Sequence, residues 1–138
     1  MLAPLVLAAA IVSGPVPVDA KLLEGKPRAK AELNFQGGRQ SCEGVLLTAV
    51  LASLGAPSHE SLRGGEMTRT VTARARDGYA VTFSLGELDE TLGNKQVIIA
   101  DTCDGKPLGP EFGPYRLVVP GDSRPGRSVF QLATIEIK

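Results

Sequence analysis

Two arginines in a glycine-containing segment are the residues of this chain best suited to hold an anion. Arg124 and Arg127 lie in the segment Gly121–Arg127, directly after Pro120. A guanidinium group matches a phosphate with two parallel hydrogen bonds, and glycines let backbone N–H groups approach the same ligand. The segment therefore indicates an anion-binding loop, or alternatively a basic turn between two strands that holds no ligand.

The two cysteines, Cys42 and Cys103, offer a second kind of chemistry. In an oxidising compartment they could be joined in a disulfide, and otherwise they are two half-buried thiols. Two cysteines and the single His59 are too few ligands for a structural zinc site.

Templates for catalysis are not matched elsewhere in the sequence. His59 lies in a loop-like segment without a nucleophile-elbow motif, so we interpret it as a solvated loop residue. Glu87, Asp89 and Glu90 are interpreted as the solvated acidic start of a short helix, not as a glycosidase pair or a metal site. No catalytic residue and no metal ligand is assigned.

Charge and composition exclude some classes of function. The 15 Lys and Arg residues balance 15 Asp and Glu residues, so the sequence predicts no nucleic-acid binding. A length of 138 residues is typical of one domain. With 16 Gly, 10 Pro and no Trp, the composition favours many turns and an aliphatic core.

Alternation of apolar and polar residues predicts strands over most of the chain. Val71, Ala73 and Ala75, for example, share one face of the segment 68–75. The compact apolar run 97–100 is typical of a strand that is buried on both faces. Strands are expected over 30–35, through Cys42, and over 68–75, 79–83, 97–100, 115–119 and 130–137.

Two segments are predicted to be helical. Between 46 and 54, leucines and valines recur at helical spacing until Gly55 and Pro57 end the pattern. Ser84 and Glu87 form the Ser-x-x-Glu pattern of a capping box, which predicts a short helix running to about Leu92. The expected fold is therefore α+β, a single domain of mixed or antiparallel strands with one packed helix and one or two short helices.

The first 20 residues differ from the rest of the chain. Met1–Val12 is almost wholly apolar, and Val18, Asp19 and Ala20 fit the small-x-small pattern before a cleavage point. Such a run is too short to span a bilayer but suits the core of a signal peptide. We expect residues 1–20 to be a signal peptide and 21–138 to form a periplasmic or secreted domain without a membrane span. A buried N-terminal strand or helix is the alternative.

Four sequence blocks, taken in order, resemble the molybdopterin-binding domain of sulfite-oxidase-type oxidoreductases. They are Gly44–Leu47, Asp77–Tyr79, Leu85–Asp89 and Gly113–Asp122. The chain looks like a small, free-standing relative of that domain, and the resemblance covers Gly44 to Lys138. It implies the same α+β scaffold.

The resemblance also implies a cofactor site. Arg116 matches a cofactor-contacting arginine of the family, while Arg124 and Arg127 fall in the loop that approaches the pterin. These three arginines are therefore the expected cofactor-binding residues, with molybdopterin as the implied cofactor. Cys42 does not match the cysteine that binds molybdenum in the family, and Phe130 stands where a basic residue is often found.

Two functional hypotheses follow from these observations. The first is an exported oxidoreductase-family domain that binds a pterin or another small anionic ligand. The second is a non-catalytic exported binding or assembly module, which keeps the scaffold without the cofactor and recognises a small anion or a partner protein.

Overall fold

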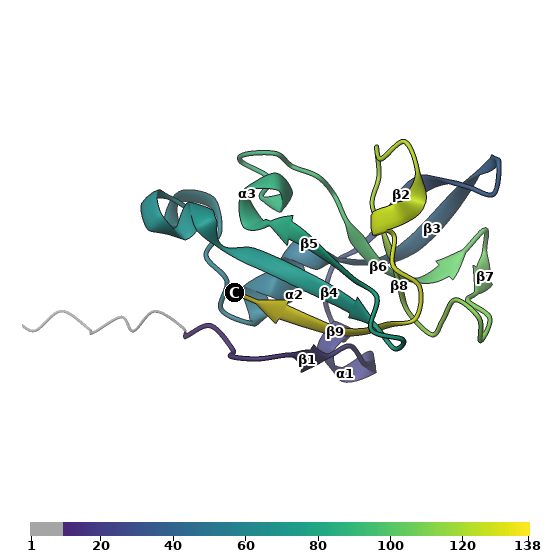
Figure 1. The fold of residues 1–138 in the computed structure, drawn as a ribbon, viewed down its shortest axis with the longest axis horizontal. Coiled ribbons are helices and arrows are strands. Elements are labelled where there is room, and N and C mark those ends of the chain that lie inside the picture. The colour runs from purple at the N-terminus through teal and green to yellow at the C-terminus, as the bar shows by residue number, and fades with distance from the viewer. Residues whose placement is uncertain (1–9) are drawn as a thin grey trace, which may run out of the picture.

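Alternating apolar residues build two antiparallel sheets in the computed structural model, which describes residues 10–138 (Figure 1). The first sheet has the strand order β1-β9-β4-β5, and consists of β1 (Val16–Pro17), β4 (Thr70–Ala75), β5 (Ala80–Ser84) and β9 (Leu132–Ile137). In the second sheet β3 lies between β2 and β6, and both β7 and β8 pair with β6. Its strands are β2 (Arg28–Phe35), β3 (Gly38–Leu46), β6 (Ile98–Cys103), β7 (Lys106–Pro107) and β8 (Arg116–Val118).

The helices are short. The longest is α2 (Leu47–Ser53), whereas α1 (Ala20–Leu23) and α3 (Leu85–Leu88) are about one turn long. The 3₁₀ segments are η1 (His59–Ser61), η2 (Gly64–Thr68) and η3 (Pro125–Arg127). Within residues 10–138, no helix has both the length and the apolar character needed to cross a bilayer. The predicted α+β class, with mostly strands and one packed helix, is confirmed.

The main core lies where the first sheet, the second sheet and α2 meet. Val71, Ala73 and Ala75 are buried together, as their spacing predicted. Leu47 and Val50 on α2 pack into the same cluster and are fully buried. Each fully buried aliphatic side chain contributes about 1.5–3 kcal/mol, so this cluster is the main source of stability.

A second, smaller cluster lies on the other face of the second sheet. It contains Leu33, Cys42, Ile98 and Val118. β3 approaches β6 so closely here that a Cβ at Gly44 would lie 1.9 Å from the carbonyl oxygen of Ile99, so only glycine fits. The register shift between Glu43 and Gly44 at the same point indicates a bulge in which Asp101 is the extra residue on β6.

Cys42 and Cys103 are directly opposite each other on β3 and β6 and form a disulfide. Both residues are buried, at 0% and 7% exposure. Of the two alternatives that the sequence left open, the disulfide is therefore confirmed. The bond joins positions 61 residues apart and fixes the central strand pair of the second sheet.

Several predicted boundaries are wrong by a few residues. The helix expected to run to Leu92 ends at Leu88, because the chain turns at Asp89 into an extended conformation. The last strand begins at Leu132 instead of Phe130, after Gln131 adopts a left-handed backbone conformation with φ +46°. The second strand of the first hairpin extends well beyond Cys42, to Leu46.

Part of the predicted signal peptide packs against the domain. The backbone N–H of Val12 donates to Leu54 O, and that of Val18 donates to Ala133 O, both at 2.9 Å. β1 pairs with the edge of β9, and Ile11, Val16 and Val18 contact the main core. Residues 11–18 are half-buried or exposed and form a strand only at Val16–Pro17, so the alternative of a buried N-terminal strand or helix is not matched by them, and residues 1–9 lie outside the described residues. Cleavage after Ala20 would remove β1, and it stays a prediction.

Replacing both Cys42 and Cys103 by alanine should lower the free energy of unfolding by about 2–4 kcal/mol, because the crosslink reduces the entropy of the unfolded chain. Urea denaturation under oxidising conditions measures this difference. In excess reductant the free energy of unfolding of the wild-type protein should fall close to that of the double variant. Equal stability of the two proteins under oxidising conditions would contradict the structural role of the disulfide.

Candidate functional site

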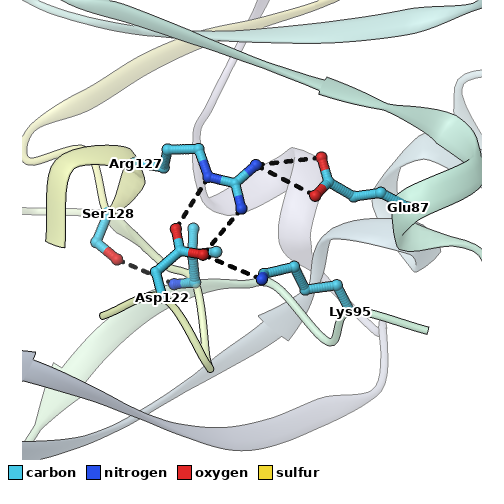
Figure 2. Close-up of polar contacts among 6 residues, drawn as sticks. Glu87, Lys95, Asp122, Arg127 and Ser128 are labelled. Atoms are coloured by element: carbon cyan, nitrogen blue, oxygen red, sulfur yellow. Dashed lines mark hydrogen bonds and ion pairs between the residues drawn. The ribbon is translucent and has the colours of Figure 1, made fainter. Parts of the chain in front are cut away.

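Arg127 lies at the centre of a network of charged side chains (Figure 2). Its Nε and Nη2 donate two parallel hydrogen bonds to the carboxylate of Asp122, each 2.9 Å long. Its Nη1 donates to both carboxylate oxygens of Glu87 at 3.2 Å. On the far side of Asp122, Lys95 Nζ lies 3.0 Å from Oδ1. Two cations and two carboxylates thus alternate in one chain of contacts.

The network joins three separate segments of the fold. Glu87 comes from α3, Lys95 from the segment before β6, and Asp122 and Arg127 from the loop between β8 and β9. Gly121, with φ +86°, turns this loop in a conformation that favours glycine. The network therefore fastens the loop 121–127 to α3 and to the segment before β6.

All four side chains in the network are partly buried, with exposed fractions between 18% for Asp122 and 33% for Arg127. The hydrogen bonds from Arg127 hold the pKa of the Asp122 carboxyl below its ordinary value, against the effect of burial, and Lys95 adds to the lowering. The same contact with Asp122 raises the pKa of Arg127 further above its already high value. Since Arg127 already serves two carboxylates, its charge is neutralised within the protein.

Arg116, another of the three predicted cofactor-binding residues, is fully buried, at 0% exposure. Its guanidinium donates to three neutral acceptors: Leu117 O at 3.3 Å, Gln40 Oε1 at 3.2 Å and Ser128 O at 3.3 Å. Burial lowers the pKa of Arg116 to about 10, which still leaves it charged at neutral pH. A ligand would reach this side chain only by displacing the groups that cover it.

Aromatic rings complete the enclosure of Arg116. The guanidinium carbon lies 4.5 Å from the ring centre of Phe130 and 5.3 Å from that of Phe35. Phe112 packs against both rings, with centroid distances of 4.7 and 5.7 Å. Cation–π contacts of this kind partly replace the hydration that a buried guanidinium loses. Phe130 thus covers the arginine.

Arg124 is the one predicted arginine with an exposed side chain. It lines a surface groove together with Tyr79, Val81, Ser123 and Gly126, and Asp122 and Arg127 lie along the same groove. The Tyr79 hydroxyl donates to Gly126 O and so holds the groove against the turn before β5. Within residues 10–138, Arg124 makes no ion pair. The fold thus brings Arg124 and Arg127 together and keeps Arg116 apart beneath the surface.

The sequence did not reveal the partners of Arg127. Ser84 accepts a hydrogen bond from the Glu87 N–H at 3.0 Å, so the capping prediction is right for the serine. The Glu87 carboxylate, however, pairs with Arg127 instead of the helix start. Asp122 lies in the predicted loop, five residues before Arg127. This short spacing was the sequence feature that could have indicated an ion pair between the two side chains.

The interpretation of Asp89 as a solvated residue is wrong. Its side chain is buried at 6% exposure and accepts hydrogen bonds from the N–H groups of His59 and Thr91. The prediction for His59 is confirmed, since its side chain is 53% exposed and contacts Glu90.

The residues present do not fit a molybdenum centre of the kind that the family resemblance implies. Both cysteines of the chain are joined in the disulfide, so neither supplies a thiolate. In the described part of the chain, no three His, Cys, Asp or Glu side chains gather in a position to hold a metal ion. No family model and no curated protein matches this chain.

Asp122→Asn should lower the free energy of unfolding at pH 7 by about 1–3 kcal/mol, because it removes a charged hydrogen-bond acceptor of Arg127 and Lys95. The folded pKa of Asp122 lies below its ordinary value of 3.8. The stabilisation is therefore fully present above that value and is lost as the pH falls through the folded pKa. Urea denaturation of both proteins at pH 7 and at successively lower pH measures the effect.

Glu32→Gln is the matched control for Asp122→Asn. It breaks the exposed contact between Glu32 and Arg39, and should cost less than about 1 kcal/mol. If Asp122→Asn costs no more than this control, or if its cost does not shrink in acid, the network does not fasten the loop.

Proposed function

We propose that the chain is a non-catalytic exported binding module, which keeps the scaffold of a sulfite-oxidase-type molybdopterin-binding domain and binds a small anion beside Arg124. The observation that carries the proposal is the use of both cysteines in the Cys42–Cys103 disulfide. A domain of this type that held molybdenum would need a free thiolate. The chain has no third cysteine to provide one.

The arginines favour the same conclusion. Arg116 is buried under Phe130, and the charge of Arg127 is balanced by Asp122 and Glu87. The oxidoreductase hypothesis, in which Arg116, Arg124 and Arg127 hold a pterin together, requires two of these residues to leave their present partners. Binding by Arg124 requires no such rearrangement.

The groove beside Arg124 suits a small anion such as a phosphate or a carboxylate. The exposed guanidinium can donate two parallel hydrogen bonds, and Gly126 leaves the adjacent backbone uncovered. Asp122 also lines the groove, so its negative charge limits the affinity for anions. The proposed ligand is therefore held chiefly by one cation at the surface.

Export is supported by the same disulfide, because disulfides persist in oxidising compartments such as the periplasm and the extracellular space. The crosslink between β3 and β6 is of this kind.

Arg124→Ala should weaken the binding of pyrophosphate about tenfold, since it removes the only unpaired cation of the groove. Titration of pyrophosphate, followed by chemical shifts of backbone amides in residues 121–127, measures the affinity. Arg63→Ala is the matched control, because Arg63 is an exposed arginine outside the groove. Equal affinities for the wild type and Arg124→Ala, or an equal loss in both variants, would overturn the proposal.

A further inference from the structure

A cavity of about 200 Å³ lies between α2, the segment that follows it and α3. Its walls are largely apolar and include Ala49 and Leu51 from α2, Pro57 from the following segment, and Leu85 and Leu88 from α3. A 150 Å³ apolar cavity in another protein is large enough to hold benzene. This one can therefore accept a branched aliphatic group of about five carbons.

One buried carboxylate, Asp89, is part of the lining. Its Oδ1 accepts a hydrogen bond from the His59 N–H at 2.8 Å, and its Oδ2 accepts from the N–H of Thr91 at 3.0 Å and from the Thr91 hydroxyl. A carboxylate can accept about four hydrogen bonds, so one acceptor position is left. None of these three donors carries a charge.

The Asp89 carboxylate is ionised and lacks a cationic partner. Burial by itself would raise its pKa, but the hydrogen bonds from Thr91 and His59 hold the pKa below the ordinary value of 3.8. In the part of the chain that the structure describes, no Lys or Arg side chain pairs with Asp89. His59 is engaged with Glu90, where Nε2 and Oε1 are 3.0 Å apart.

The lining of the cavity thus combines negative charge with apolar side chains. Asp89 and Glu90 both line it, and His59 is the only titratable group with a basic nitrogen among the lining residues. An uncompensated charge in a partly desolvated site attracts an opposite charge more strongly than it would in water. A ligand that complements this site carries a cationic head and an aliphatic tail.

We infer that this cavity binds a small aliphatic ammonium ion, with its hydrocarbon chain among Leu51, Leu85 and Leu88 and its ammonium group at Asp89. The site lies on the α2 and α3 side of the molecule and takes a ligand of opposite charge to that proposed for the Arg124 groove. It is therefore independent of the proposed function, and either can fail without the other.

Three compounds with the same branched chain test the inference: isopentylammonium, isopentanol and isovalerate. Titration calorimetry or amide chemical shifts of residues around the cavity should give an affinity that falls in that order, with a Kd on the order of 1 mM for the ammonium ion. The ammonium ion should bind at least tenfold more tightly than the carboxylate. Equal binding of the three, or tighter binding of isovalerate, would overturn the inference.

Two variants locate the site. Asp89→Asn should reduce the affinity for isopentylammonium at least tenfold and leave that for isopentanol nearly unchanged. Ala49→Leu keeps a residue compatible with α2 but fills the cavity, so it should abolish binding of both compounds. If Asp89→Asn fails to fold, Ala49→Leu still tests whether the cavity is the binding site. Glu111→Gln, which removes an exposed carboxylate outside the cavity, should change neither affinity, and a loss equal to that of Asp89→Asn would indicate unspecific attraction.

Discussion

The buried guanidinium of Arg116 is the constraint on which the arrangement of this domain depends. It connects β8, which carries it, to Gln40 on β3 and to the backbone at Ser128, next to the network residue Arg127. A buried cation with no carboxylate partner is costly unless its donors are satisfied and its faces are covered. The rings of Phe35 and Phe130 and the three neutral acceptors meet that requirement. The packing of the loop after β8 is therefore tied to this one side chain.

The two cysteines and Arg127, which could in principle bind a cofactor, also have structural roles instead. The thiols of Cys42 and Cys103 crosslink β3 and β6, and Arg127 fastens the loop through Asp122 and Glu87. In each case a residue that could contact a cofactor instead stabilises the scaffold. Within the described part of the chain, two groups are left for ligands: the exposed cation of Arg124, which makes no ion pair, and the buried carboxylate of Asp89, which lacks a cationic partner and lies beside an apolar cavity.

Period-two alternation was enough to predict most strands, because faces such as Val71, Ala73 and Ala75 repeat the contact with the core. The short elements α1 and β1 were not predicted, since a pattern of two to four residues has no periodicity to detect. The site was harder to predict, because its pairs are distant in sequence: Glu87 and Arg127 meet only after β5 and β8 are in place. Asp89 was interpreted from the sequence as a solvated residue. Its carboxylate instead contacts a segment 30 residues earlier in the chain, where the His59 N–H donates to it.

We propose that the domain works without a metal centre, since the chain has no cysteine free to bind one. The most direct test is the molybdenum and pterin content of protein purified from its native compartment, in cells with intact cofactor maturation. Elemental analysis and oxidised-pterin fluorescence should show far less than one cofactor per chain, and mass spectrometry of the unreduced protein should show Cys42 joined to Cys103. Near-stoichiometric molybdenum and pterin in that preparation would contradict the claim.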